Sequence, residues 1–243
     1  MKRSGWRILF CIGCLISVPF IHAREIAVTN YKTTHYSLSI EIDYSEELVY
    51  GQCMLTVRNN SDSGISAIPL LLYKLFEVSA VKDNLGNPLS FSQEVEAFVD
   101  WPVNRVNYIK VALAGTLEPE QEFTLVIEYA GPLSGNTEAS RYVHDHISEE
   151  FTVIRPDCYT YPIIGVPVDR EMMAIGYKPS FNYTLKVKVP KGLTVANMGQ
   201  LDSLVHTESH SIFTYSNIKP AWRMDIRGNG NAVSRDGSRE RFG

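Results

Sequence analysis

The strongest structural signal in this sequence is a two-residue alternation of apolar and polar side chains. Between Phe181 and Val189 every second residue is apolar, and the residues between them are polar or charged. Successive side chains of an extended strand point to opposite faces, so this segment predicts a strand with one buried face. The Pro-Lys-Gly sequence at 190–192 predicts the turn that ends it.

Short segments of similar character recur along the chain and predict about a dozen strands. They are 36–42, 49–58, 68–72, 78–82, 89–92, 108–113, 123–129, 151–155, 181–189, 193–196, 211–215 and 223–226. We expect 78–82 to form a hairpin with 89–92, and 108–113 to pair with 123–129. The polar residues 131–149 predict a long surface loop.

No long window shows the 3.6-residue period of an amphipathic helix. Many short strands separated by turn residues are typical of all-β proteins. The sequence therefore predicts an all-β fold, an antiparallel β-sandwich or saddle-like sheet assembly.

Residues 1–23 have the order of a secretory signal peptide, with a basic start, the apolar run Ile8–Val18 and a small residue at Ala23. The run is about half the roughly 20 residues that span a bilayer. We expect cleavage after Ala23 and a secreted, periplasmic or cell-envelope protein with no stable membrane span. An uncleaved anchor and a lipoprotein site at Cys14 remain open alternatives.

The charge balance argues against two classes of partner. The chain has 23 basic and 27 acidic residues, and cleavage would remove three of the basic ones. Nucleic acid and anionic membrane surfaces attract basic proteins, so neither is expected as a partner. Cys53 and Cys158 would remain, either as one disulfide or as two buried thiols.

The stretch 227–243 is rich in glycine, asparagine, serine and arginine, which predicts a disordered tail. The expected organisation is therefore a signal peptide at 1–23, a β domain at 24–226 and a tail at 227–243. A truncated or frameshifted reading frame would account for such a tail.

Four motifs, in order and with matching spacing, resemble the N-terminal β domain of zinc aminopeptidases of the aminopeptidase N family, over roughly residues 31–226. They are Tyr36–Ile40, Val49–Asn59 with its internal glycine, Ile127–Leu133 (similar to Tyr-x-Gly-x-Leu) and Val189–Asn197 (similar to Val-Pro-x-Gly). The chain departs from the family after Tyr161-Pro162, where the family usually has Cys-x-Asp-Glu-Pro. No substrate-contacting residue is carried over.

The segment His206-Thr207-Glu208-Ser209-His210 is similar in composition to the zinc motif of that family, His-Glu-x-x-His. The glutamate, however, follows the first histidine by two positions, about 100° further around a helix than the position of the catalytic base. The family's third ligand would fall at Asn229, and its Gly-x-Met-Glu-Asn strand is missing. We therefore interpret this segment as a loop between two strands.

Other constellations are weaker. His144 and His146 could share one side of a strand but lie in a polar segment with no further ligands nearby. No Gly-x-Ser-x-Gly nucleophile elbow is present, and Cys158 matches no catalytic signature. Four aromatic residues could either line a binding groove or pack in the core or at its rim. They are Trp101, Tyr159, Tyr161 and Trp222.

The sequence thus predicts no catalytic, cofactor-binding or metal-binding residue in this chain. The resemblance implies a non-catalytic β domain that caps the active-site cleft of a complete zinc enzyme and helps to position its peptide substrate. Zinc would then belong to a catalytic domain outside this chain. The alternatives are a stand-alone secreted module that binds peptide, glycan or protein, and a structural subunit of an envelope complex.

Overall fold

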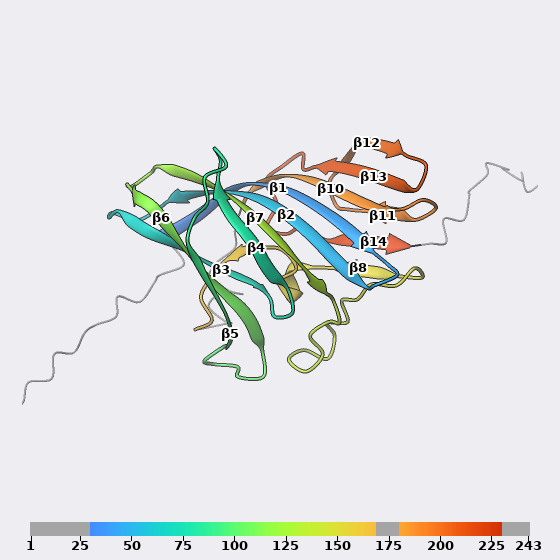
Figure 1. The fold of residues 1–243 in the computed structure, drawn as a ribbon, viewed down its shortest axis with the longest axis horizontal. Helices are drawn as coiled ribbons and strands as arrows, with labels where there is room; N and C mark the ends of the chain where they lie inside the picture. Colours follow the sequence, from blue (N-terminus) through green and yellow to red (C-terminus); the bar gives the residue numbers. More distant parts are fainter. Residues whose placement is uncertain (1–29, 169–179, 230–243) are drawn as a thin grey trace, which may run out of the picture.

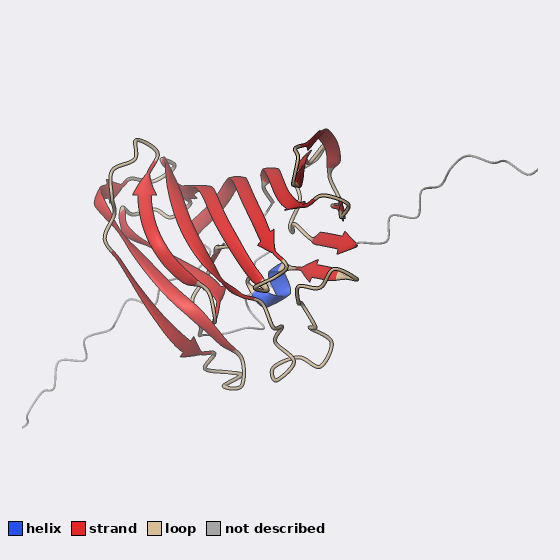
Figure 2. Ribbon diagram, turned by 45° about the vertical axis from the view of Figure 1, so that its right-hand side comes forward, coloured by secondary structure: helices blue, strands red, loops and turns tan. Residues whose placement is uncertain are grey.

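A computed structural model describes residues 30–168 and 180–229. Fourteen strands and one short 3-10 turn, Pro156–Cys158, form this part of the chain (Figures 1 and 2). The strands are β1 (Tyr31–Asp43), β2 (Leu48–Asn59), β3 (Ile65–Tyr73), β4 (Glu77–Asp83), β5 (Phe91–Ala97), β6 (Arg105–Leu117), β7 (Glu122–Pro132), β8 (Thr152–Ile154), β9 (Ile163–Ile164), β10 (Asn182–Pro190), β11 (Thr194–Ala196), β12 (Gln200–His206), β13 (His210–Ser216) and β14 (Ile226–Asn229).

The described strands form three sheets. A seven-stranded sheet has the order β12-β13-β10-β1-β2-β7-β4, a four-stranded sheet the order β5-β6-β3-β9, and a small sheet the order β11-β14-β8. Neighbouring strands are antiparallel except β1 and β10, which run parallel from the His35–Asn182 pair to the Glu41–Lys188 pair. The predicted all-β fold is confirmed.

The alternation in the sequence determines which face of each strand is buried. In β10 the apolar residues from Tyr183 to Val189 are buried, and the residues between them are exposed or half-buried. One continuous core joins Leu55 and Ile127 of the seven-stranded sheet to Leu70 of the four-stranded sheet. Each such aliphatic side chain contributes roughly 1.5–3 kcal/mol when fully buried.

The outer face of the four-stranded sheet is also covered in part. Leu71 and Tyr108 point away from the main core and form a second cluster with Phe98, against which Trp101 and Tyr159 pack. β3 is therefore buried on both faces from Ile68 onward, which is why its sequence shows an apolar run rather than an alternation.

Tyrosine hydroxyls fix the irregular segment that follows β8. The hydroxyl of Tyr36 donates to the carbonyl of Pro162 over 2.9 Å, and that of Tyr129 donates to the carbonyl of Thr160 over 3.1 Å. Both tyrosines are buried in the seven-stranded sheet. They satisfy carbonyls that would otherwise be buried without a partner.

Two predicted strand pairings are wrong. β4 pairs with β7 and β5 pairs with β6, so the expected hairpin of 78–82 and 89–92 is limited to the Lys82–Pro88 bridge and a hydrogen bond from Leu89 to Val81. The turn between them carries the chain from one sheet to the other. β6 and β7 likewise lie in different sheets, because β7 pairs with β2 along its whole length.

Three other expectations need correction. The loop after β7 is not confined to the surface, because Leu133, Val143 and Ile147 reach the core. β12 was missed because all seven of its residues are exposed, which leaves no alternation to read. The tail boundary is wrong because 227–229 belongs to β14, which pairs with both β11 and β8.

The predictions for residues 1–23 and 230–243 fall outside the described residues. Within the described ranges, no helix is long and apolar enough to cross a membrane.

Candidate functional site

The histidine pair that resembles a zinc motif lies on a β hairpin. β12 ends at His206 and β13 begins at His210, and the amide of Thr207 donates to the carbonyl of His210 over 2.8 Å. The Nδ1 atom of His206 lies 3.0 Å from Ser211 Oγ, and that of His210 lies 2.7 Å from Ser209 Oγ. The predicted loop between two strands is confirmed, and each imidazole has a hydroxyl partner within the hairpin.

The second histidine pair flanks the buried carboxylate of Asp145, which forms an ion pair with the partly exposed Arg155. The carboxylate of Asp145 accepts hydrogen bonds from Arg155 Nε and Nη2 at 2.8 and 2.5 Å, whereas His144 and His146 are exposed. Burial raises the pKa of the Asp145 carboxyl, and the hydrogen bonds from Arg155 act in the opposite direction. This carboxylate therefore holds the loop to Arg155.

The described residues do not fit the zinc ion that the resemblance implies. Across 30–168 and 180–229, no three His, Cys, Asp or Glu side chains are grouped so that they could hold a metal ion. Structural zinc sites usually have four protein ligands and catalytic sites three. No catalytic step through zinc follows from this part of the chain.

Neither cysteine has the surroundings of a nucleophile. Cys53 and Cys158 are unpaired and buried. Burial raises the pKa of both thiols, so each is neutral at physiological pH. Of the two interpretations that the sequence left open, the structure has two separate buried thiols.

The four aromatic residues singled out in the sequence divide into two groups. Tyr161 is buried, and Trp101 and Tyr159 pack against the second core cluster. Trp222 is 58% exposed and lies in the segment after β13. Only Trp222 of these four borders one of the cavities described below.

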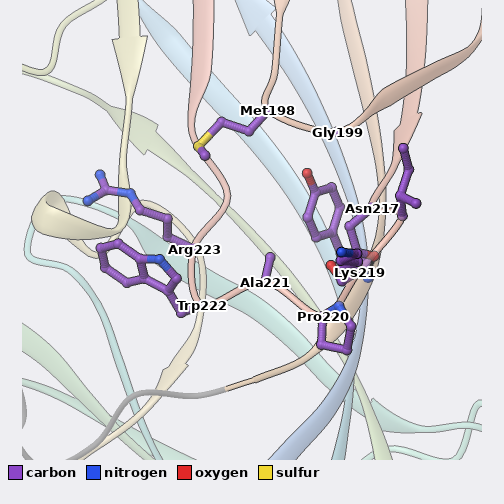
Figure 3. Close-up of a pocket in the computed structure, with 10 residues that line it drawn as sticks. Met198, Gly199, Asn217, Lys219, Pro220, Ala221, Trp222 and Arg223 are labelled. Atoms are coloured by element: carbon purple, nitrogen blue, oxygen red, sulfur yellow. Dashed lines mark hydrogen bonds between the residues drawn. The ribbon is translucent and has the colours of Figure 1, made fainter.

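Trp222 borders an open cavity of about 440 Å³. The cavity lies between the turn before β12 and the segment 217–223 (Figure 3). Figure 3 shows Met198, Trp222 and Arg223 on one side of Ala221, and Asn217, Lys219 and Pro220 on the other. The remaining lining residues are Tyr183, Gly199 and Ile218.

Hydrogen bonds fix both walls of this cavity. Asn217 accepts from the amide of Tyr183 and donates to the carbonyls of Phe181 and Lys219. The Tyr183 hydroxyl donates to Asn197 Oδ1 over 2.7 Å. Burial raises the pKa of this phenol, so it stays a neutral donor.

An ion network holds the other end of the segment 217–223. Arg223 contacts Asp157 through Nη2 and Asp225 through Nε, each at 2.7 Å. Its guanidinium also lies 5.0 Å from the ring centroid of Trp222, within the range of a cation–π interaction. The indole of Trp222 is therefore exposed, while the backbone beside it is held in place by the ion pairs of Arg223.

A second cleft of about 510 Å³ lies between the edges of the two large sheets. The side chain of Gln93 crosses it, accepting from the amide of Val78 over 2.9 Å and donating to the carbonyl of Phe76 over 2.8 Å. The carbonyl of Phe76, directly before β4, also accepts from Asn107 over 2.6 Å. Gln93 thus occupies hydrogen-bonding groups at the edge of β4, so that another strand cannot pair there. We therefore interpret the cleft as part of the framework rather than as a binding site.

The cavity beside Trp222 is the best candidate for a functional site, and the sequence indicated it only in part. Trp222 was recognised as a possible groove residue. Met198 and Ile218, which are 75% and 80% exposed, carried no signal because each stands alone among polar neighbours. The two segments come together because β12 pairs with β13, which places Gln200 opposite Ser216.

Comparison with known proteins shows similarity at the level of the fold. No protein-family model matches the sequence, and no curated protein is significantly similar to it. The crystal structure of an M1 zinc metallopeptidase from Deinococcus radiodurans matches 82% of this chain with a TM-score of 0.63 and 17% identity. A mutant of that enzyme bound to a Tyr-Ser-Ala substrate matches with a TM-score of 0.62 and 16% identity.

A two-domain M1 zinc metallopeptidase mutant bound to L-tryptophan gives a TM-score of 0.61 at 17% identity. This chain spans about 42–43% of the length of these structures. The resemblance read from the sequence is confirmed for the fold: the described β domain matches part of an M1 zinc metallopeptidase.

Proposed function

We propose that this chain is a non-catalytic β domain of a zinc metallopeptidase, which caps the active-site cleft of a zinc-binding part and helps to position the peptide substrate. The observation that carries the proposal is the fold match, which covers 82% of this chain but only 42% of the metallopeptidase chain. A β domain that corresponds to less than half of an enzyme needs the remainder for catalysis.

The chemistry of the described residues supports a non-catalytic role. His206 and His210 are engaged within a hairpin, and Asp145 is committed to Arg155. The two thiols are buried and neutral. Zinc therefore belongs to a different stretch of polypeptide under this proposal.

A second candidate function is a stand-alone secreted module that binds a peptide, a glycan or a protein. The open cavity beside Trp222 favours it, because exposed aromatic residues are common in recognition sites. This candidate requires no zinc domain anywhere. The first function therefore requires that the genome encode a zinc-binding domain for this chain, whereas the second does not.

The downstream DNA separates the two candidates. We expect a reading frame, in any of the three forward frames, that encodes His-Glu-x-x-His and a glutamate 19 residues beyond the second histidine. The purified chain with added zinc should release no chromophore from aminoacyl p-nitroanilides. Absence of the zinc motif downstream would favour the stand-alone module, and hydrolysis by the chain alone would refute both candidates.

We also propose export, on the basis of residues 1–23. The mature protein, isolated from the native host, should begin at Arg24 in Edman sequencing. An unprocessed Met1 in the exported fraction would contradict cleavage.

A further inference from the structure

β12 forms one edge of the seven-stranded sheet, and its outer side is open. In Figure 1 this strand lies at the upper right, and among the described strands its neighbour in the sheet is β13. All seven of its residues are exposed, and they include the apolar residues Leu201, Leu204 and Val205. An exposed edge strand presents unpaired backbone groups to which another strand can add.

The two edges of this sheet differ in their protection. At the opposite edge, the side chain of Gln93 accepts from the amide of Val78 in β4. Lysine and proline are the residues that most often guard an open edge against pairing. The sequence 199–209, which covers β12 and the turn after it, contains neither of them and no arginine. β12 therefore lacks the side chains that usually discourage a second strand.

The hydrogen bonds of the hairpin show which backbone groups of β12 face outward. The amide of Thr207 donates to the carbonyl of His210 over 2.8 Å, so these two residues form a hydrogen-bonded pair. Such pairs alternate with non-hydrogen-bonded pairs along an antiparallel ladder, and the register of β12 with β13 is regular over 203–206. Leu204 and His206 therefore direct their N–H and C=O groups away from β13.

The sequence of β12 is complementary to itself. In a symmetric dimer, residue i of one copy faces residue j of the other and the reverse also holds. If two copies of β12 pair in antiparallel fashion about a twofold axis at Leu204, Asp202 of each copy lies opposite His206 of the other. An axis at Val205 would instead place Asp202 opposite Glu208, and like charges directly opposite each other destabilise a sheet. The charges thus favour the register centred on Leu204.

The side chains of Asp202 and His206 are available for this contact. Within 30–168 and 180–229, Asp202 takes part in no ion pair. The Nδ1 atom of His206 lies 3.0 Å from Ser211 Oγ, which leaves Nε2 for another partner. When Nδ1 accepts from the hydroxyl of Ser211, Nε2 carries a proton that it can donate to a carboxylate.

We propose that two copies of this chain pair through β12, so that their seven-stranded sheets join into one continuous sheet. The outward N–H and C=O groups of Leu204 bond to those of Leu204 in the second copy. At each end of the interface, His206 of one copy donates to the carboxylate of Asp202 of the other. This inference goes beyond the proposed function, because it assigns a dimer interface whichever of the two candidate functions the chain performs.

The first test reverses the charges at the ends of the interface. The regular edge of β12 is short, so we expect a weak dimer that dissociates on dilution. Analytical ultracentrifugation of the full chain between about 1 μM and about 1 mM gives its dissociation constant. The variants are Asp202→Lys, His206→Glu and the double reversal. Asp62→Lys, at an exposed position in the turn between β2 and β3, is the matched control, and thermal unfolding shows whether each variant is folded.

We expect each single reversal to weaken dimerisation about fivefold or more, because both Asp202–His206 contacts of the dimer are lost, and the control to change it less than about twofold. The double reversal should restore the wild-type constant to within about threefold, since the two exchanged charges attract each other again. A wild-type monomer at every concentration would overturn the inference. So would single reversals without effect, or a double reversal as weak as the single ones.

The second test examines the register through a disulfide. Opposite residues of a hydrogen-bonded pair have Cα atoms about 5.5 Å apart, which a disulfide can bridge. Leu204→Cys should therefore give a covalent dimer under mild oxidation, seen on a non-reducing gel. Ser203→Cys should give little, because its counterpart in the second copy lies opposite Val205. The native thiols are buried, and equal cross-linking of the two variants would overturn the proposed pairing.

Discussion

Two residues from separate sequence motifs, Gly51 and Tyr129, meet in the folded chain. They are partners in the register of β2 and β7, and a Cβ atom on Gly51 would overlap the ring of Tyr129. Taken alone, the motif around either residue could equally be explained as an ordinary strand with a bend, without any family resemblance. The glycine is needed because the tyrosine ring occupies the space above it.

We expect Gly51→Ala to lower the free energy of unfolding by about 1–3 kcal/mol, because a Cβ forces the packed ring of Tyr129 to move. Urea denaturation measures this. Gly115→Ala is the matched control, because nothing lies within 4 Å of a Cβ at that position, and it should be neutral or slightly stabilising. In a Tyr129→Leu background the cost of Gly51→Ala should shrink; an undiminished cost would contradict the packing explanation.

The two buried thiols give a second prediction for single residues. Burial raises the pKa of Cys53 and Cys158, so the reactive thiolate is scarce in the native protein at pH 8. Iodoacetamide should label both residues rapidly in concentrated urea and only slowly without it, as measured by peptide mass spectrometry. Rapid native labelling, or a peptide pair linked by a disulfide, would show that the thiols are not buried as described.

At the level of strands, the sequence predicted faces better than partners. Alternation located β10 and β13 correctly because each has one buried face. It missed β12, which has none, and it paired β4 and β6 with their neighbours in sequence although those neighbours lie in other sheets. The spacing of apolar residues along a strand shows which face of that strand is buried. Which strand lies next to it depends on contacts between segments that are distant in the sequence.

Gln93 shows how a side chain protects an edge that alternation cannot reveal. We expect Gln93→Ala to lower the free energy of unfolding by about 1–3 kcal/mol, because the amide of Val78 loses its partner, whereas the carbonyl of Phe76 keeps its hydrogen bond from Asn107. Urea denaturation and analytical ultracentrifugation measure stability and self-association through the opened edge. Glu94→Ala, at an exposed position of the same strand, should change stability by less than about 0.5 kcal/mol. Equal effects of the two variants would refute a protective role for Gln93.

For the whole molecule, the sequence was sufficient for the fold class and for the family resemblance of the fold. It was not sufficient for the candidate site. Trp222 and Met198 come from segments on either side of β13, and their exposure is a property of the assembled sheet. A cavity made by two segments leaves no pattern in either one.

The central claim is that this β domain acts with a zinc-binding partner and is inactive alone. The most direct measurement is the rate at which p-nitroaniline is released from an aminoacyl p-nitroanilide by the chain, by the downstream-encoded His-Glu-x-x-His polypeptide, and by their equimolar mixture, each with and without EDTA. We predict no release by the chain, weak release by the polypeptide and clearly faster, EDTA-sensitive release by the mixture. A mixture no faster than the polypeptide alone would contradict the account.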